Sequence, residues 1–338
     1  MNDNPAPPIL ALENVYKRFP AARRQGRLGR RGVVRALDGV SLTLRPGEIV
    51  GLVGESGSGK STLAMSVMGL EPPTEGRVLL EGDDLYATLR GPDRLAIRRK
   101  IQLIFQDPYE SLNPRQTIYD ILSEPLWIHH LVTSRAEAET RVIAALNEVG
   151  LTPPQTYLTR RPEGLSGGQR QRVGIAAALI LDPQVVVADE PVSMLDVSLR
   201  SEILMLLRNL RDRRGLTLLY ITHDLATAAL FTDRIAVLYL GRIVEEGRTA
   251  QVLREPQHPY TRALLSVIPV SNPRLRRPRE ILQGEIPDAT EVPRGCRFHP
   301  RCPDAIDRCR LTDPQLMPTA SGQRAACILT GVPLHAVE

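Results

Sequence analysis

The first 255 residues alternate between short apolar runs and stretches in which apolar positions recur every three or four residues. The apolar runs predict β-strands at 40–44, 48–53, 77–80, 100–106, 185–189, 216–222 and 234–239. The helical spacing predicts α-helices at 60–69, 135–149, 169–181, 198–213 and 224–231. Strands that alternate with helices indicate an α/β fold with a parallel sheet covered on both faces.

Several stretches depart from this alternation. Residues 9–19 predict an edge strand, and the Arg- and Gly-rich residues 20–35 predict a loop. Residues 107–116 predict another loop, after which the pattern is helical, so we expect a helical subdomain at about 107–165. From residue 256 onward proline and arginine become frequent and the periodicity weakens. Residues 9–255 thus predict the main domain, and residues 256–338 a small appended C-terminal region.

Length and composition are those of an ordinary globular protein. The chain has 338 residues, enough for one large domain plus an appendage, with 42% hydrophobic and 24% charged residues. It contains no run of about 20 apolar residues, the length that crosses a bilayer. The first residues lack the basic and apolar regions of a signal peptide. We expect a cytoplasmic protein whose contact with a membrane is made through partner proteins.

The charge balance is mildly basic, at +5 from 43 basic and 38 acidic residues. This excess is small for a nucleic-acid binder, and no nucleic-acid partner is expected. The basic residues gather in two groups, which are Arg23, Arg24, Arg27, Arg30, Arg31 and Arg35, and then Arg274, Arg276, Arg277 and Arg279. Solvated basic loops explain them better than a dedicated anion-binding surface does.

A glycine-rich loop lies between the strand that ends at Val53 and the next helix. Residues 54–61 fit G-x-x-x-x-G-K-[ST], the phosphate-binding loop. Its glycines allow successive N–H groups to point into one concavity, and the helix N-terminus adds positive charge. Lys60 is expected to reach the β- and γ-phosphates, and the Ser61 hydroxyl to bind Mg²⁺. The expected nucleotide contacts here are Gly54, Glu55, Ser56, Gly57, Ser58, Gly59, Lys60, Ser61 and Thr62.

Two later motifs carry related chemistry. The strand at 185–188 is followed by Asp189, which can hold hydrated Mg²⁺, and Glu190, which can polarise the attacking water. Residues 165–169 open a helix with a serine and two glycines, so a second anion-binding N-terminus is available. One nucleotide does not need two such loops from one chain. The second loop is explained if it completes the ATP site of another subunit.

These motifs resemble those of ATP-binding cassette (ABC) ATPases. The motifs occur in the order found in that family: the phosphate loop, Gln106, the signature 165–169, and the segments 185–190, 193–196 and 222–224. The resemblance covers about residues 9–255. It implies a P-loop NTPase cassette with a RecA-like parallel-sheet core, an antiparallel β subdomain and a helical subdomain. It also implies that two cassettes pack head to tail with ATP between them.

The resemblance assigns catalytic roles around the γ-phosphate. Glu190 resembles the general base, and Gln106 resembles the residue that contacts Mg²⁺ and the attacking water. His223 resembles the γ-phosphate contact, and Lys60 completes this group. A non-catalytic partner subunit is a rival interpretation, but the intact Lys60, Asp189, Glu190 and His223 argue against it.

The resemblance also assigns contacts away from the γ-phosphate. Phe19 resembles the aromatic residue that stacks on adenine, where Tyr is commoner; a core aromatic on an edge strand is the alternative. Asp196 resembles the residue that crosses the dimer interface, and Met194 stands where the family often has Ala, a conservative change. Contacts with a partner's ATP are expected from Ser166, Gly167, Gly168 and Gln169.

A narrower resemblance is to the oligopeptide/dipeptide importers. It rests on the stretches 105–115, 190–193, 258–265 and 295–303, and the basic insert at 20–35 is similar to that of the second of their two paired ATPases. The implied partners are a paralogous second ATPase, two transmembrane permease subunits and an extracytoplasmic solute-binding protein. The chain would then lie at the cytoplasmic face of the membrane. Nickel, glutathione or a short glycoside are alternative cargoes, and a soluble ABC ATPase acting on nucleic acid is a distant alternative.

The only cysteines are Cys296, Cys302, Cys309 and Cys327, spaced C-x5-C-x6-C-x17-C. In a reducing compartment, four thiols in a proline-rich, core-poor segment suggest a metal staple. The spacing matches neither common zinc pairs nor the usual ferredoxin pattern, so it leaves the metal open. Resemblance to the importer tail favours a structural [4Fe-4S] cluster, with Zn²⁺ as the alternative. His299 could add a ligand, but we expect it to face solvent.

Overall fold

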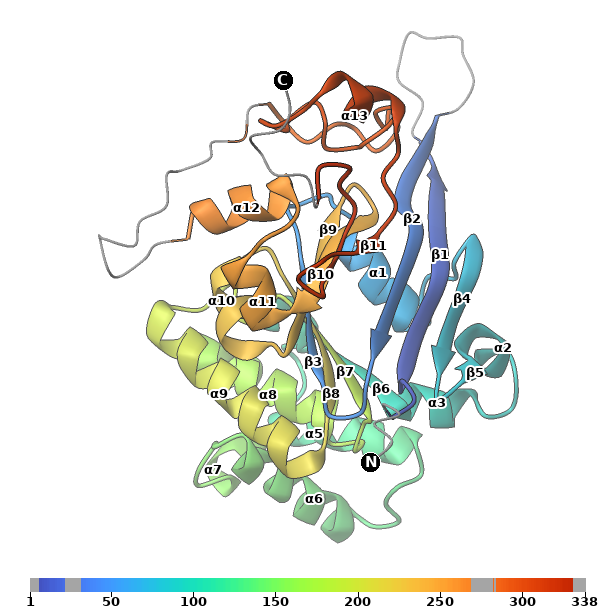
Figure 1. The fold of residues 1–338 in the computed structure, drawn as a ribbon. Helices are drawn as coiled ribbons and strands as arrows, with labels where there is room; N and C mark the ends of the chain where they lie inside the picture. Colours follow the sequence, from blue (N-terminus) through green and yellow to red (C-terminus); the bar gives the residue numbers. More distant parts are fainter. Residues whose placement is uncertain (1–5, 22–31, 269–281, 283, 331–338) are drawn as a thin grey trace, which may run out of the picture.

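The computed structural model describes residues 6–21, 32–268, 282 and 284–330. Apart from Arg35, both predicted arginine groups lie outside these residues. Within them, no helix combines the length and apolar character that a bilayer crossing requires. The elements form two sheets flanked by helices, and the C-terminal region lies beside one end of both sheets (Figure 1).

The larger sheet has eight strands in the order β11-β12-β10-β9-β3-β8-β7-β6. Its parallel part is β6 (Ile101–Ile104), β7 (Val185–Asp189), β8 (Thr217–Thr222), β3 (Ile49–Val53) and β9 (Arg234–Tyr239). The central strands β3 and β8 are buried throughout because both faces of this sheet are covered. The predicted parallel core is therefore confirmed.

Three antiparallel strands continue this sheet beyond β9, and sequence reasoning did not predict them. They are β10 (Arg242–Arg248), β12 (Arg324–Ala325) and β11 (Met317–Pro318). Glu245 of β10 pairs with Ala325 of β12. The last strands thus come from the C-terminal region, which extends the main sheet instead of only following it.

The second sheet is antiparallel, in the order β2-β1-β4-β5. Its strands are β1 (Leu10–Pro20), β2 (Val33–Leu44), β4 (Glu75–Leu80) and β5 (Asp83–Asp84). The prediction of an edge strand at 9–19 is wrong, because β1 pairs with β2 on one side and β4 on the other. The first residues of β2 also lie inside the stretch 20–35 that was expected to be a loop, since pairing with β1 extends the strand.

Helices cover the sheets and fill the stretch after β6. They are α1 (Lys60–Val67), α2 (Leu85–Leu89), α3 (Arg94–Lys100), α4 (Pro108–Ser111), α5 (Ile118–Ile128), α6 (Arg135–Glu148), α7 (Gln155–Leu158), the 3₁₀ turn η1 (Pro162–Gly164), α8 (Gly167–Leu179), α9 (Val197–Arg214), α10 (Leu225–Phe231), α11 (Thr249–Arg254), α12 (Pro259–Ser266) and α13 (Asp307–Leu311). The predicted loop at 107–116 is wrong over α4, since the Asp107 carboxylate accepts the Tyr109 N–H and starts a helical turn.

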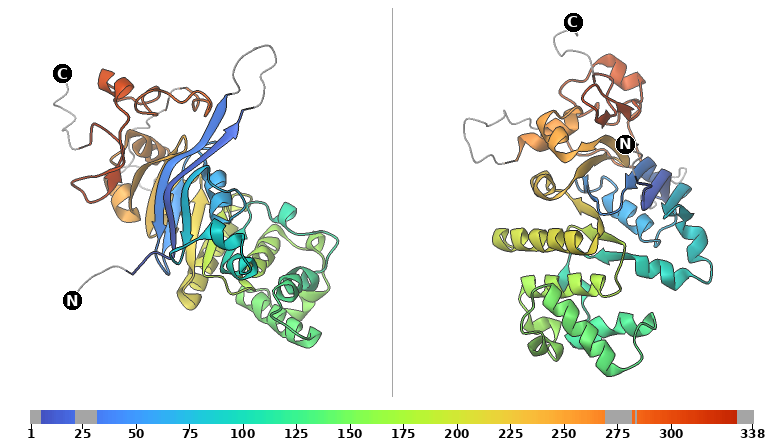
Figure 2. Two further views of the ribbon diagram at one scale, coloured as in Figure 1. Left: turned by 90° about the vertical axis from the view of Figure 1, so that its right-hand side faces the viewer. Right: turned by 60° about the horizontal axis from the view of Figure 1, so that its bottom comes forward.

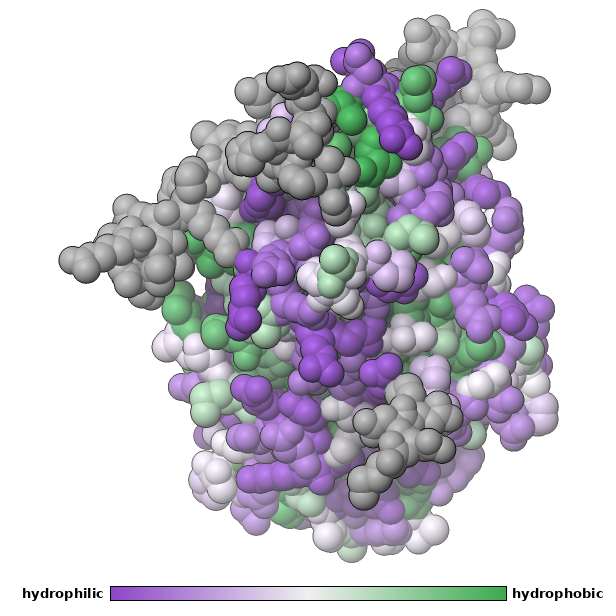
Figure 3. Space-filling model, in the orientation of Figure 1, coloured by the Kyte–Doolittle hydropathy of each residue, from purple (hydrophilic) through white to green (hydrophobic). Residues whose placement is uncertain are grey.

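Two hydrophobic cores lie on opposite faces of the main sheet. Alternate residues of β3 divide between them: Ile49 and Val53 join the core that includes α5, α6 and α8, while Val50 and Leu52 join the core shared with α1 and the antiparallel sheet. This division follows from the two-residue period of a strand. The helices α5 to α8 lie together away from the antiparallel sheet (Figure 2). Hydrophilic residues cover most of the face in Figure 3.

Candidate functional site

The phosphate loop follows β3 directly, and packing requires its glycines. A Cβ on Gly54 would lie 2.3 Å from the Leu238 carbonyl oxygen, and one on Gly59 would lie 2.4 Å from the Ala36 carbonyl oxygen. Gly59 also has a φ of +110°, where side chains are disfavoured. Gly57, with a φ of +78°, faces open space. The loop is therefore held against β9 and β2, with its other side free for a ligand.

Lys60 begins α1 and points back along the loop. Its Nζ donates to the carbonyl oxygens of Gly54 at 2.7 Å and Glu55 at 2.9 Å. Burial lowers the pKa of Lys60, while Glu190, Asp189 and Glu55 oppose that shift. The Lys60 ammonium can turn to an anionic ligand by exchanging two carbonyl contacts for phosphate oxygens.

An open cavity of about 910 Å³ lies over this loop. The predicted residues that line it are Phe19, Glu55, Ser56, Gly57, Gly59, Lys60, Ser61, Thr62, Gln106, Glu190 and His223. Its size lies in the range of ligand sites. Ser58 is buried, and its hydroxyl has no hydrogen-bond partner among the described residues. The residues and the space fit a nucleotide with Mg²⁺.

The C-terminal region also lines this cavity, which sequence reasoning missed. Ile286 and Ala289 join Phe19, Val34 and Ala36 among its lining residues. The backbone N–H of Arg35 in β2 donates to the Ala289 carbonyl at 3.1 Å, which attaches the segment around Ala289 to the cassette. No local pattern marks these two residues, because their place depends on contact between distant segments. They enlarge the apolar part of the cavity.

The three residues predicted around the γ-phosphate contact one another. Gln106, Glu190 and His223 follow β6, β7 and β8, which are neighbours in the sheet. The Gln106 Nε2 lies 3.3 Å from the Glu190 Oε2, and the His223 Nδ1 lies 2.9 Å from the Glu190 Oε1. Because parallel strands end at the same edge of a sheet, residues far apart in sequence converge there.

The backbone at Glu190 is unusual for a residue with a side chain. Its φ is +45°, in the left-handed region. The Glu190 N–H donates to the Ile221 carbonyl at 2.9 Å, which fixes this conformation. Such strained positions gather at functional sites. Here the Glu190 side chain is turned towards His223 and Gln106 and is only 14% exposed.

Asp189 ends β7 beside Glu190. Burial raises the pKa of Asp189, the Glu190 carboxylate adds to this shift, and Lys60 opposes it. Two adjacent carboxylates in a partly buried site favour binding of a cation. The Ser61 hydroxyl lines the cavity, and it and the Asp189 carboxylate are oxygen donors of the kind that Mg²⁺ prefers.

The structure does not bring the signature segment to this cavity. Ser166 is exposed and caps α8, where its hydroxyl accepts the Gln169 N–H and the Gln169 side chain accepts the Ser166 N–H. Asp196 is also exposed, at the start of α9. Among the described residues, those that line the cavity do not include Ser166, Gly167, Gly168, Gln169 or Asp196 of the same chain.

All four cysteines line one small pocket in the C-terminal region, which we call the cysteine pocket. Cys296, Cys302, Cys309 and Cys327 share it with His258, His299, Phe298 and Leu329. The four thiols are free of disulfides. Burial raises the pKa of Cys296 to about 11 and that of Cys302 to about 12. The thiol form of these two residues therefore predominates at pH 7.

The predicted metal site is not supported by this arrangement. Among the residues that the structure describes, no three His, Cys, Asp or Glu side chains form a group that could hold a metal ion. His299 is half-buried and lines the cysteine pocket, with its Nδ1 at 2.8 Å from the Cys296 carbonyl oxygen, so it agrees only in part with the prediction that it faces solvent. The four described thiols converge on one pocket, but they do not adopt a ligating geometry there.

Two family models match the chain. The model described as ABC transporter matches residues 37–193, and the one described as oligopeptide/dipeptide transporter, C-terminal region, matches residues 244–309. A putative peptide import ATP-binding protein of Brucella ovis is 48% identical over 95% of this chain and 98% of its own. The oligopeptide transport ATP-binding protein AppF of Bacillus subtilis is 43% identical over 95% of this chain and 97% of its own.

Solved structures agree with these matches. An ATP-binding cassette solved as a dimer with ADP and phosphate bound is 33% identical, with a TM-score of 0.61 over 71% of this chain and 98% of its own. A Clostridium perfringens cassette that is part of an ABC transporter complex is 29% identical, with a TM-score of 0.61 over 73% of this chain and 91% of its own.

The fold, the phosphate loop and these matches define an ATP-hydrolysing subunit of an ABC transporter. Within that class, the chain belongs to the family of peptide and oligopeptide import ATP-binding proteins. The fold class and the family predicted from sequence are therefore confirmed. As a member of this class, the chain is a membrane-associated subunit that uses ATP and Mg²⁺.

Proposed function

We propose that this chain drives the import of di- and oligopeptides across the cytoplasmic membrane by hydrolysing ATP. The main observation in favour of a peptide cargo is that residues 244–309 of the C-terminal region match the oligopeptide/dipeptide transporter model. Relatives named for peptide import or oligopeptide transport align with 95% of the chain. The chain would bind two transmembrane permease subunits at the cytoplasmic face, and an extracytoplasmic solute-binding protein would deliver the peptide.

Glu190 is proposed as the general base for the attacking water. Its carboxylate lies between Gln106 and His223, and each of them contacts one of its oxygen atoms. A base must have a free oxygen within hydrogen-bond reach of the water it activates. We therefore expect Gln106 to turn to Mg²⁺ and His223 to the γ-phosphate when nucleotide binds, which leaves Glu190 free to accept the proton.

The remaining ATP contacts divide between the two ends of the cavity. Phe19 is proposed to stack on adenine, which its position among the apolar lining residues supports. Residues 54–62 would bind the phosphates, with Lys60 on the β- and γ-phosphates. Ser61, Gln106 and Asp189 would hold Mg²⁺, which neutralises charge on the transferred phosphoryl group.

A second cassette is proposed to complete the site. Ser166 and Asp196 are exposed, and the signature residues 166–169 lie outside the cavity of their own chain, which leaves this segment available to a partner's nucleotide. The α8 N-terminus is suited to an anion because its first N–H groups are directed there. We expect the partner to be a paralogue, as the family resemblance implies.

The helices between β6 and α8 are proposed to pass the motion of the dimer to the permease. They correspond to the helical subdomain expected at about 107–165 within a cassette at 9–255. A groove of about 340 Å³ lies at the junction of α2, α3 and α5 and is lined by Leu85, Leu89, Ile97 and Ile128. Ile128 is 52% exposed. Such an open apolar groove suits a helix from a permease subunit.

The cysteine pocket is proposed to hold a structural [4Fe-4S] cluster within the C-terminal region at 256–338, with Zn²⁺ as the alternative. The proposal starts from the four cysteines Cys296, Cys302, Cys309 and Cys327, which line one pocket although the described side chains there form no metal-holding group. The thiols would have to ionise on binding. Iron and acid-labile sulfide analysis of anaerobically purified protein tests it: one zinc per chain without sulfide would exclude the cluster.

Uptake of a labelled tripeptide tests the transport proposal. Cells that lack this chain should lose most uptake, and the wild-type chain should restore it. The Glu190→Gln variant, produced at the same level, should not restore it. If tripeptide uptake is unchanged in the deletion strain while uptake of nickel, glutathione or a glycoside falls, the peptide cargo is refuted and the ATPase assignment remains.

A further inference from the structure

Glu55 introduces a carboxylate into the phosphate loop. It directly follows Gly54, it lines the nucleotide cavity, and its carbonyl accepts a hydrogen bond from Lys60 at 2.9 Å. A negative charge at this point repels a triphosphate, and the repulsion is strong where water is partly excluded. Without compensation, Glu55 would therefore weaken the binding of ATP.

Arg301 of the C-terminal region provides this compensation. Its Nη1 lies 3.2 Å from the Glu55 Oε1, and its Nη2 lies 3.2 Å from the Glu55 Oε2. This two-pronged pairing is the favoured geometry between a guanidinium and a carboxylate. The Arg301 side chain is 7% exposed, so salt in the solvent screens the pair only weakly.

Tyr260 adds a contact to the backbone of the same loop residue. Its hydroxyl accepts the Glu55 N–H at 3.0 Å. Burial, followed by the nearby Glu55 carboxylate, raises the pKa of Tyr260, so the hydroxyl stays protonated. The side chain and the backbone of Glu55 are thus both held by the C-terminal region.

Contacts within the protein hold Arg301 in place. Its guanidinium lies 5.9 Å from the centroid of the Tyr239 ring, and its backbone N–H donates to the Phe298 carbonyl at 2.9 Å. The Phe298 ring in turn packs against Tyr239 and Tyr260, with centroids 5.3 and 5.4 Å away. A side chain that is held in this way loses little freedom when the ligand arrives.

We propose that Arg301 is a positioning residue of the ATP site, which neutralises Glu55 and holds the phosphate loop in the conformation that accepts ATP. Through this pair the C-terminal region sets the affinity of the cassette for ATP. The Gln106–Glu190–His223 group is a separate set of contacts, so we expect binding to change and the rate of the bound complex to stay the same. The proposal rests on the phosphate contacts of residues 54–62, which ATP binding by the wild-type chain tests separately.

The Arg301→Met variant tests the proposal on the full chain. It leaves the Glu55 charge without a partner, so the Kd for a fluorescent ATP analogue with Mg²⁺ should rise about tenfold. In the assembled transporter the KM for ATP should rise by a similar factor while kcat stays within about twofold. The Arg301→Lys variant keeps the positive charge, so its Kd for the ATP analogue should lie between those of Arg301→Met and the wild type.

The double variant Glu55→Gln/Arg301→Met distinguishes compensation of charge from a structural role. It removes both charges, so the Kd for the ATP analogue should return to within about threefold of the wild-type value. A merely structural Arg301 would give the opposite result, because removing Glu55 as well could not restore the lost packing.

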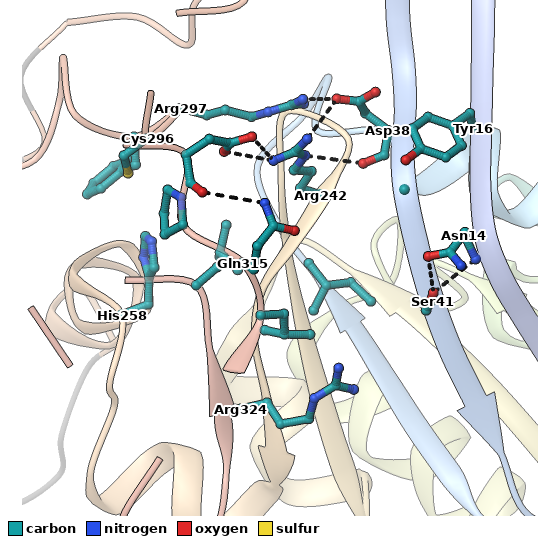
Figure 4. Close-up of a pocket in the computed structure, with 18 residues that line it drawn as sticks. Asn14, Tyr16, Asp38, Ser41, Arg242, His258, Cys296, Arg297, Gln315 and Arg324 are labelled. Carbon is teal, nitrogen blue, oxygen red and sulfur yellow. Dashed lines mark hydrogen bonds and ion pairs between the residues drawn. The ribbon is translucent and has the colours of Figure 1, made fainter. Parts of the chain in front are cut away.

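Arg297 offers a matched control (Figure 4). It lies four positions before Arg301, its side chain is also 7% exposed, and it pairs with Asp38 of β2 instead of the phosphate loop. Arg297→Met should lower the thermal stability as much as Arg301→Met, with much less change in the Kd for the ATP analogue. The proposal is overturned if Arg301→Met leaves the Kd unchanged, if Glu55→Gln does not rescue it, or if Arg297→Met raises the Kd equally.

Discussion

The phosphate loop and the cysteine pocket bring reactive side chains together in different ways. In the phosphate loop, the proposed phosphate contacts all lie in one continuous segment, 54–62, and its glycines and the start of α1 fix the geometry locally. In the cysteine pocket, side chains between residues 258 and 329 meet only through packing. The geometry of the first site is therefore fixed locally, while the second depends on packing between distant segments and shows no group of described side chains that could hold a metal ion.

The two regions are also in contact with each other. Arg301, beside Cys302, pairs with Glu55 of the phosphate loop. The C-terminal region further lines the nucleotide cavity through Ile286 and Ala289. The C-terminal region thus contributes lining residues to the cavity over the phosphate loop, where we propose that ATP binds.

The largest predicted effect is on ATP hydrolysis, at the site around the phosphate loop. Glu190→Gln keeps the size of the side chain and removes the base, so kcat for ATP hydrolysis should fall about 10²- to 10⁴-fold. Binding of ATP should be retained, because the phosphate loop is unchanged. Steady-state hydrolysis and nucleotide binding by the purified transporter measure the two quantities. Hydrolysis at the wild-type rate would refute Glu190 as the base.

A methyl group tests how rigidly the loop is held. Gly59→Ala would put a Cβ 2.4 Å from the Ala36 carbonyl oxygen at a φ of +110°, so we expect a loss of about 3 kcal/mol in the free energy of unfolding. Gly174→Ala in α8 is the control, since the described residues leave open space around the position that a Cβ would take there. That change should be neutral or stabilise by up to about 1 kcal/mol. Urea unfolding of both variants compares them, and equal effects would contradict a rigid loop.

Acid should weaken the C-terminal region through His258. Burial lowers the pKa of His258 to about 3, from an unfolded value near 6.5. The neutral His258 therefore stabilises the fold above pH 6.5, and this contribution is lost as the pH falls towards 3. At pH 5 the loss is about 2 kcal/mol.

His258→Asn provides the comparison for this acid effect. Asparagine can also cap α12, as the His258 Nδ1 does by accepting the Tyr260 N–H at 3.1 Å, and it does not titrate. Between pH 7 and pH 5 the variant should lose about 2 kcal/mol less than the wild type in the free energy of unfolding. Parallel losses in the two proteins would contradict a buried neutral imidazole.

The smallest effect is expected at a cysteine, if the thiols are free. Cys309 is 5% exposed, and Cys309→Ala removes one buried sulfur atom, at a cost of about 1 kcal/mol in the free energy of unfolding. If Cys309 were a ligand of a cluster or of zinc, its removal would lower the free energy of unfolding several times more, and the metal would be lost from the purified protein. Thermal unfolding and metal analysis of the same samples decide whether Cys309 is a free thiol or a metal ligand.

Sequence patterns were reliable where the geometry is local or follows from strand order. The alternation of strands and helices predicted the parallel core, and the ends of β6, β7 and β8 carry Gln106, Glu190 and His223 as expected. The same reasoning failed for β1, since nothing in residues 9–19 reveals that β4 pairs on its second side. It also missed β11 and β12, whose two-residue lengths leave no periodicity to detect.

The sequence by itself determined the phosphate loop, the cassette class and the residues Gln106, Glu190 and His223 that follow three neighbouring strands of the sheet. The phosphate loop depends on backbone conformations that particular residues impose, such as the left-handed φ at Gly59. Only the tertiary structure decided that Arg301 and Tyr260 reach Glu55, and that the four described thiols share one pocket without a ligating arrangement. Such contacts join segments that are far apart in the chain, and their partners are chosen by packing of the whole molecule, which no local pattern encodes.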